Sequence, residues 1–199
     1  MNTTLGTNGT PSHEFPPTRV ALWLFLGVVT MLFAMLLSAY LVRLGTADEH
    51  ALPKPALLWL NTLVLVLSSL ALEGARRRRG ERPFASTLWL AGGALAVLFL
   101  LGQLWAWREL AHAGYFLATN PASSFFYLLT ALHGLHLLGG LIAWTQTARC
   151  VIQEGRGESR DGAKGFATPL STKLELCALY WHFLLAVWIV ILILMWVTT

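Results

Sequence analysis

Five apolar stretches, each about as long as a bilayer is thick, limit this chain to a membrane-spanning helical fold. A helix of about 20 apolar residues crosses the hydrocarbon core of a bilayer. The chain is 56% hydrophobic and only 12% charged, and a soluble domain of that composition would expose large apolar patches. We therefore predict an all-α protein, a single domain over residues 20–198 that forms a bundle of five transmembrane helices. The predicted spans are residues 20–42, 56–73, 85–107, 124–147 and 175–197.

The N-terminal segment differs from the rest of the chain. Residues 1–19 are polar and lack the basic start and apolar centre of a cleavable signal peptide. We expect them to form a disordered polar tail, which Pro16–Pro17 separates from the first span.

Basic residues are distributed unevenly between the two ends of the predicted bundle. With five spans, the N-terminal tail lies on the same side as the loops 76–84 and 148–173, and these three segments hold eleven of the 14 lysines and arginines. Because basic loops stay on the cytoplasmic side of a bacterial membrane, we expect a cytoplasmic N-terminus and a periplasmic C-terminus. The three remaining basic residues, on the opposite side, are Arg43, Lys54 and Arg108.

The segment Ser124–Trp144 of the fourth span carries two histidines near its middle. His133 and His136 are three residues apart, which places them on one side of a helix together with Gly140. An ionisable group at that depth has to face protein, a cavity, a headgroup or a metal rather than acyl chains. His182 in the last span lies at a similar depth, so a haem held by two histidines of facing helices is one interpretation.

Polar contact between helices is the interpretation that we favour for these side chains. A transition-metal site normally has three or four ligands, and the only carboxylate on the same face, Glu175, is two turns nearer the cytoplasmic end. A proton path is a further alternative, but the first two spans offer it hardly any ionisable group. The residues expected to make inter-helix polar contacts are His133, His136, His182, Asn61 and Gln103.

Two further groups of residues are expected to face neighbours of the bundle. Small residues in the fourth span, Gly134, Gly139 and Gly140, let another helix approach closely. Charged and aromatic residues near the cytoplasmic ends of the spans are candidates for contact with lipid headgroups, although ordinary interfacial side chains look the same. These candidates are Glu73, Arg76, Lys173, Glu175, Tyr180 and Trp181. Since the run Arg76–Arg79 abuts a span, we interpret it as a membrane flank and not as a nucleic-acid-binding patch.

Four motifs, in the same order along the chain, resemble subunit III of the haem–copper terminal oxidases. FFYLLTALHGLHLLGG at 125–140 resembles the TGFHGLHVxxG helix of that family, and ELCALYWHFLLAVW at 175–188 is similar to its closing ExxxxYWHFxxxxW helix. LNTLVLVLSS at 60–69 and WLFLGVVTMLFAMLLSAYLVR at 23–43 look like two further conserved helices. The likeness covers residues 20–197 and fits the short, five-helix bacterial form.

The resemblance implies a non-catalytic subunit of a respiratory complex in the bacterial inner membrane. Such a subunit binds no haem or copper itself, because these belong to partner subunits I and II. It packs against subunit I, holds structural phospholipid, and supports oxygen reduction, aerobic electron transport and proton translocation by the complex. A subunit IV, a cytochrome c and a respiratory supercomplex are further candidate partners.

This chain departs from the family pattern at two positions, and other functions remain open. Val29 stands where many members have a mid-membrane glutamate, and Leu185 where many have an aspartate, so no role of those carboxylates is carried over. The alternatives are subunit III of a quinol oxidase, an accessory subunit of nitric oxide reductase, and a free-standing membrane haem protein or carrier.

Overall fold

The computed structural model describes residues 17–44, 57–78, 80–115, 121–155 and 170–197. These residues form five α-helices, each long and apolar enough to cross a membrane, which confirms the predicted all-α, five-span architecture. The helices are α1 Pro17–Leu44, α2 Leu57–Arg77, α3 Arg82–His112, α4 Pro121–Gly155 and α5 Leu170–Val197. The predicted N-terminal tail up to residue 16, and residues 156–169 of the long basic loop, lie outside the described residues.

Helices α3 and α4 are longer than the apolar segments that predict them. The helix α3 starts near a proline, Pro83, which lacks the N–H that a first turn leaves unpaired. It ends at His112, with Ala113 as the C-cap residue, and Gly114 follows with φ of +87°, a conformation that glycine adopts without strain. The helix α4 has 35 residues and continues eight residues past the predicted end of its span. Both helices therefore carry polar residues beyond the apolar core of the membrane.

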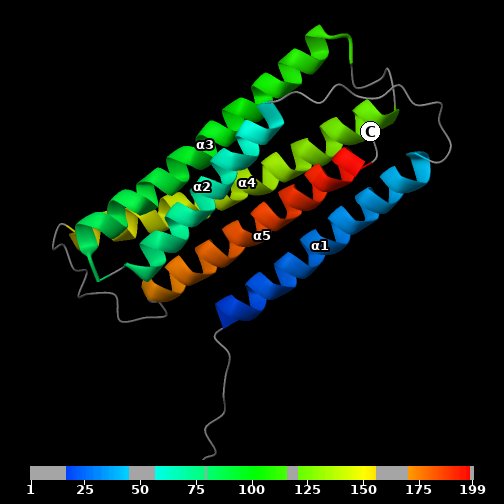
Figure 1. Cartoon of the computed structure of the whole chain (residues 1–199). Helices are drawn as coiled ribbons and strands as arrows, with labels where there is room; N and C mark the ends of the chain where they lie inside the picture. The colour runs from blue at the N-terminus through cyan, green and yellow to red at the C-terminus, as the bar shows by residue number, and fades with distance from the viewer. Residues whose placement is uncertain (1–16, 45–56, 79, 116–120, 156–169, 198–199) are drawn as a thin grey trace, which may run out of the picture.

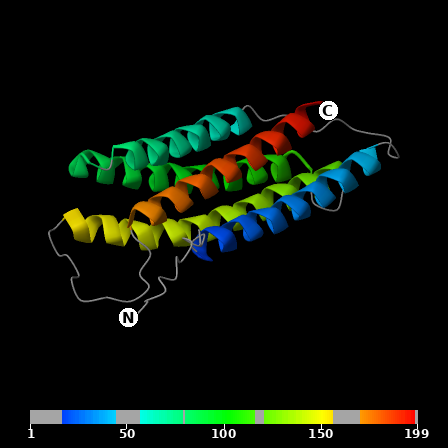
Figure 2. The same cartoon turned by 90° about the horizontal axis from the view of Figure 1, so that it is seen from below.

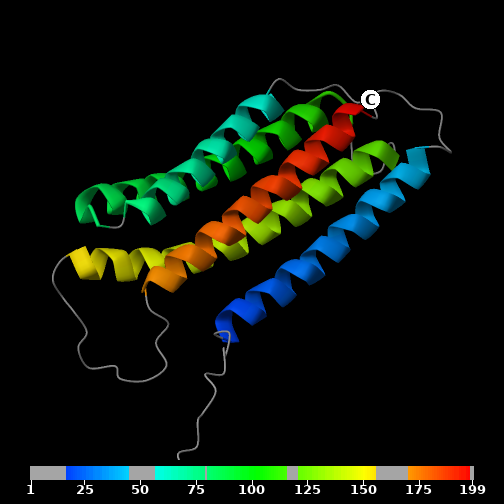
Figure 3. The same ribbon diagram turned by 60° about the horizontal axis from the view of Figure 1, so that its bottom comes forward.

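The five helices pack in three layers, which Figure 3 shows from the side. The helices α2 and α3 form a hairpin on one side, α4 and α5 lie in the middle, and α1 lies on the other side. In the part of the chain that the structure describes, α1 contacts only α4 and α5 (Figures 1 and 2). The N-terminus of α5 therefore lies beside the N-terminus of α1 and the C-terminus of α2.

Large side chains of α5 fill the centre of the bundle. Trp181, Leu184 and Trp188 are fully buried, three and four residues apart, as the spacing of one helix face requires. A smaller cluster joins α1 to the middle layer, with Val29 and Phe33 packed against Leu129 of α4. The buried face of α1 is narrow, since most of its large apolar residues are exposed on the outside of the bundle. An exposed apolar helix surface of this kind suits contact with acyl chains or with another membrane protein.

Candidate functional site

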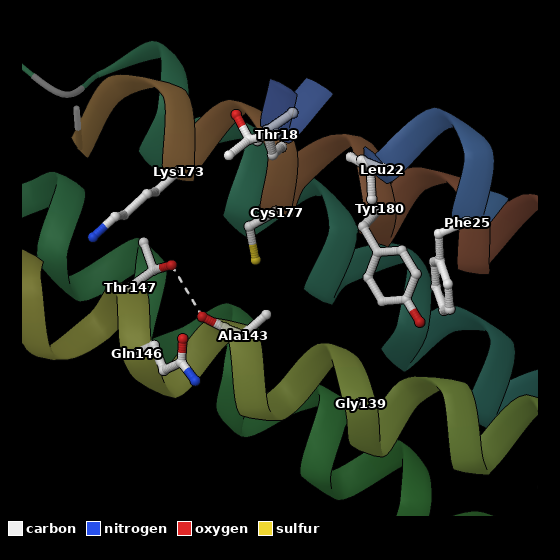
Figure 4. A pocket seen from close by; sticks show the side chains of 11 residues that line it. Thr18, Leu22, Phe25, Gly139, Ala143, Gln146, Thr147, Lys173, Cys177 and Tyr180 are labelled. Carbon is white, nitrogen blue, oxygen red and sulfur yellow. Dashed lines mark hydrogen bonds between the residues drawn. The ribbon is translucent and has the colours of Figure 1, made fainter. Parts of the chain in front are cut away.

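A cleft of about 440 Å³ opens between α1 and the pair α4 and α5 (Figure 4). Its polar end is formed by Lys173 of α5 with Gln146 and Thr147 of α4. Its other end is apolar, with Phe25 of α1 facing the ring of Tyr180 of α5. The cleft therefore changes from charged to apolar along the direction of the helices.

Small residues of α4 create this cleft. Gly139 lines it, and no atom lies within 4 Å of the place where its side chain would be. Gly140 faces α5 instead, where a methyl group would meet the rings of Tyr180 and Trp181. Gly134 lies elsewhere on α4 and is near Leu100 of α3. Two successive glycines thus serve different surfaces, because neighbouring residues of a helix point in different directions.

Tyr180 fixes the wall of the cleft. Its hydroxyl donates a hydrogen bond to the carbonyl oxygen of His136 at 2.8 Å, so α5 is joined to the backbone of α4. At the polar end, Lys173 Nζ lies 3.8 Å from the Sγ of Cys150. Among the described residues Lys173 has no carboxylate partner, which leaves its positive charge available at the mouth of the cleft.

The two glutamates predicted near the cytoplasmic ends both form salt bridges. Glu73 binds Arg76 and Arg77 on its own helix at 2.6 Å each. Glu175 of α5 binds Arg19 of α1 at 2.7 Å, which joins the outer helix to the middle layer. A polar pocket of about 370 Å³ lies between α2 and α5, lined by Glu73, Arg76, Arg77, Glu175 and His182 among others.

Two of the three intramembrane histidines form hydrogen bonds within their own helices. The Nδ1 atoms of His136 and His182 lie 2.8 and 2.6 Å from the carbonyl oxygens four residues earlier. Since a carbonyl only accepts, each Nδ1 is the donor, and Nε2 of the neutral ring is left as an acceptor. The side chain of His182, which carries this acceptor nitrogen, lines the pocket between α2 and α5.

His133 is fully buried between aromatic rings. Its centroid lies 5.8 Å from that of Phe99 and 5.1 Å from that of Trp188, and neither ring nitrogen has a hydrogen-bond partner among the described residues. Both side-chain polar atoms of Gln103 and Nδ2 of Asn61 are also buried without a hydrogen-bond partner among the described residues.

The described residues include no cluster of three or more His, Cys, Asp or Glu side chains that could hold a metal ion.

Hydrogen bonds between helices are made by tryptophans and hydroxyl groups. Trp181, which the sequence suggested as a candidate for lipid contact, is fully buried and donates to Ser68 Oγ of α2. Trp188 donates to Thr62 Oγ1 at 3.0 Å, and Trp144 to the carbonyl of Trp89 at 3.0 Å. The hydroxyl residues Thr62 and Ser68 of the second span were the signal in the sequence from which hydrogen bonds between helices could be predicted. Their tryptophan partners could not be identified in this way, because they are distant in the sequence.

Curated relatives match nearly the whole chain. No protein-family model matches it. Cytochrome c oxidase subunit 3 of Thermostichus vulcanus is 29% identical over 94% of this chain and 91% of its own length. The protein of the same name from a Synechocystis species is 31% identical, covering 92% of this chain and 77% of its own length. The chain belongs to the cytochrome c oxidase subunit 3 family.

Membership of the subunit 3 family confirms the resemblance that the four motifs indicate. Another member, from a Bacillus species, is 28% identical over 85% of this chain and 80% of its own length. With five helices able to span a membrane, this member of the family is a multi-pass protein of the bacterial inner membrane.

Proposed function

We propose that the chain is the non-catalytic third subunit of a haem–copper oxidase that accepts electrons from cytochrome c. The observation that carries this proposal is the similarity to subunit 3 proteins along nearly the entire chain. In the proposed complex, the haems and copper are held by subunits I and II, while this chain supports oxygen reduction and proton translocation by its contact with them.

The exposed apolar surfaces provide the docking face for the catalytic subunit. Lipid tails are as apolar as leucine, so close packing and small residues decide which faces bind another membrane protein. The outer layer formed by α1 packs least extensively against the rest of the bundle, since among the described helices α1 contacts only α4 and α5. Association with subunit I would extend the packing of this helix.

The cleft between α1, α4 and α5 is proposed to hold a structural phospholipid. Lys173 has the charge and the position to bind a phosphate group, and the apolar end near Phe25 suits an acyl chain. With the N-terminus in the cytoplasm, as the basic residues predict, this lipid belongs to the cytoplasmic leaflet.

Co-purification tests the assignment to an oxidase complex. A tagged form of this chain, extracted in mild detergent, is expected to carry haem-containing partner subunits and the visible spectrum of an oxidase. The chain expressed without those partners is expected to be colourless. A haem spectrum from the isolated chain would contradict the proposal.

Native mass spectrometry of the complex tests the lipid site. The substitution Lys173→Gln is expected to lower the amount of retained anionic phospholipid about fivefold, because one basic group near an anionic headgroup contributes about 1 kcal/mol. Arg149→Gln is the matched control, since Arg149 is exposed near the same end of α4 and does not line the cleft. Equal lipid retention in both variants would exclude Lys173 as the headgroup contact.

A further inference from the structure

A second groove lies at the opposite end of the bundle, between the end of α3 and the beginning of α4. Its volume is about 830 Å³. The small side chains of Ala111 and Ala131 form the hollow, and Leu104 and Leu128 line it with about half of their surface exposed. Because the helices alternate in direction, this groove lies near the membrane surface opposite to that of the Lys173 cleft.

Two aromatic residues of the groove have already used their polar atoms elsewhere. Trp107 Nε1 donates to Thr130 Oγ1 at 3.1 Å, and the Tyr127 hydroxyl donates to the carbonyl of Tyr115 at 3.0 Å. Neither Trp107 nor Tyr127 therefore has a side-chain N–H or O–H left to donate to a ligand. Aromatic side chains of this kind are typical of the level at which acyl chains meet headgroups.

Among the residues that the structure describes, Arg108 is the one charged residue that lines the groove. Its side chain is exposed, and no carboxylate among the described residues lies within salt-bridge distance. It lies one turn of α3, about 6 Å, beyond Leu104, on the side of the membrane surface. A ligand that fits has a long apolar body and a single anionic group at one end.

We propose that this groove binds an anionic phospholipid of the leaflet opposite to that of the Lys173 cleft. The guanidinium group of Arg108 donates paired hydrogen bonds to the phosphate, which its planar shape favours. The acyl chains lie along Leu104 and Ala131 toward the middle of the bundle. A helix of a partner subunit is the other possible occupant, but it would leave Arg108 without a counter-charge unless it supplied one.

Binding to three variants of the purified oxidase complex tests this site. Each complex is reconstituted in nanodiscs of equal parts phosphatidylcholine and phosphatidylglycerol, and the retained lipid is measured by native mass spectrometry. Arg108→Gln is expected to weaken retention of phosphatidylglycerol about fivefold. Ala131→Trp, which fills the groove and leaves Arg108 in place, is expected to lower it as well. Arg43→Gln, at the same end of the bundle but outside the groove, is expected to change nothing.

Wild-type retention in both Arg108→Gln and Ala131→Trp would overturn the proposal, and so would an equal loss in Arg43→Gln. A photo-reactive amino acid in place of Leu128 identifies the occupant directly. Cross-linking to phospholipid supports the proposal, whereas cross-linking to another oxidase subunit overturns it. The Lys173→Gln variant tests the other cleft, so the two lipid sites succeed or fail independently.

Discussion

The indole N–H of Trp181 donates a hydrogen bond to Ser68 Oγ at 3.0 Å, across the interface of α5 and α2. Ser68 in turn donates from the same oxygen to the carbonyl of Gly92 in α3 at 2.7 Å. A single hydroxyl group thus connects three helices. The side chains of Ser68 and Trp181 are both fully buried. Buried groups bound in this way are costly to separate, because each lost partner leaves an unpaired donor or acceptor.

Ser68→Ala removes that connection with little change in volume. We expect it to destabilise the subunit by about 1–3 kcal/mol, since the N–H of Trp181 is left buried without a partner. Thermal release of this subunit from the detergent-solubilised complex provides the measurement. Thr145→Ala is the control, because the Thr145 hydroxyl is exposed and bonds only within its own helix. Equal melting of Ser68→Ala and wild type would show that the bond contributes nothing.

Gly93→Ala is expected to disturb the packing of α3 against α4. A methyl group at this position would overlap the indole ring of Trp144, whose N–H donates to the carbonyl of Trp89. Overpacking of this kind costs about 1–3 kcal/mol, which should lower the melting temperature of the solubilised complex. Gly27→Ala is the matched control, as no neighbouring atom lies within 4 Å of the added group. If the two variants melt alike, Trp144 moves aside without cost.

Reversing the charges of Arg19 and Glu175 tests how α1 is attached. Arg19→Glu places two carboxylates where the salt bridge of 2.7 Å was, and should weaken the docking of α1. Both side chains are nearly half exposed, so the loss is about 1 kcal/mol or less. The double variant Arg19→Glu with Glu175→Arg should restore stability, as measured by the double-mutant cycle. No recovery in the double variant would mean that the pair does not interact.

His133→Phe is expected to be tolerated. The nitrogens of His133 have no partner among the described residues, and its ring packs against Phe99 and Trp188, so an apolar ring should preserve stability within about 1 kcal/mol. His133→Ala is expected to cost about 3 kcal/mol because it leaves a cavity. Thermal unfolding of both variants in the solubilised complex separates the two effects. A large loss in His133→Phe would instead indicate a hydrogen bond to a bound water or a partner subunit.

Carbodiimide labelling examines the position at which the family often has a glutamate. Residues 23–40 contain no carboxylate, so we expect no label there in the native chain. Val29→Glu creates a target, but Val29 is buried against Phe33 and Leu129. Burial of an unpaired polar group should cost more than about 2 kcal/mol, and Val29→Leu controls for the change of size. Labelling of the native segment, or a stable Val29→Glu variant, would contradict this expectation.

The three histidines illustrate how far spacing predicts a site. His133 and His136 were expected to share one side of α4, and a separation of three residues does place them only about 60° apart. In the three-layer bundle this angle is enough to separate their surroundings. His133 lies among aromatic rings of α3 and α5, and His136 lies beside Phe25 and Phe33 of α1. The spacing of two residues along a helix specifies the directions in which their side chains point. It does not specify which neighbouring helix each side chain contacts.

The sequence by itself determined that this protein has five membrane-spanning helices and which family it belongs to. Helix length and hydropathy are local properties, and the order of short motifs is visible without a fold. Only the tertiary structure decided which apolar side chains face protein, since Trp181 is fully buried and Trp105 is largely exposed. The physical reason is that lipid and protein interior are both apolar, so the contrast between water and core that reveals buried faces in soluble proteins is missing in the bilayer.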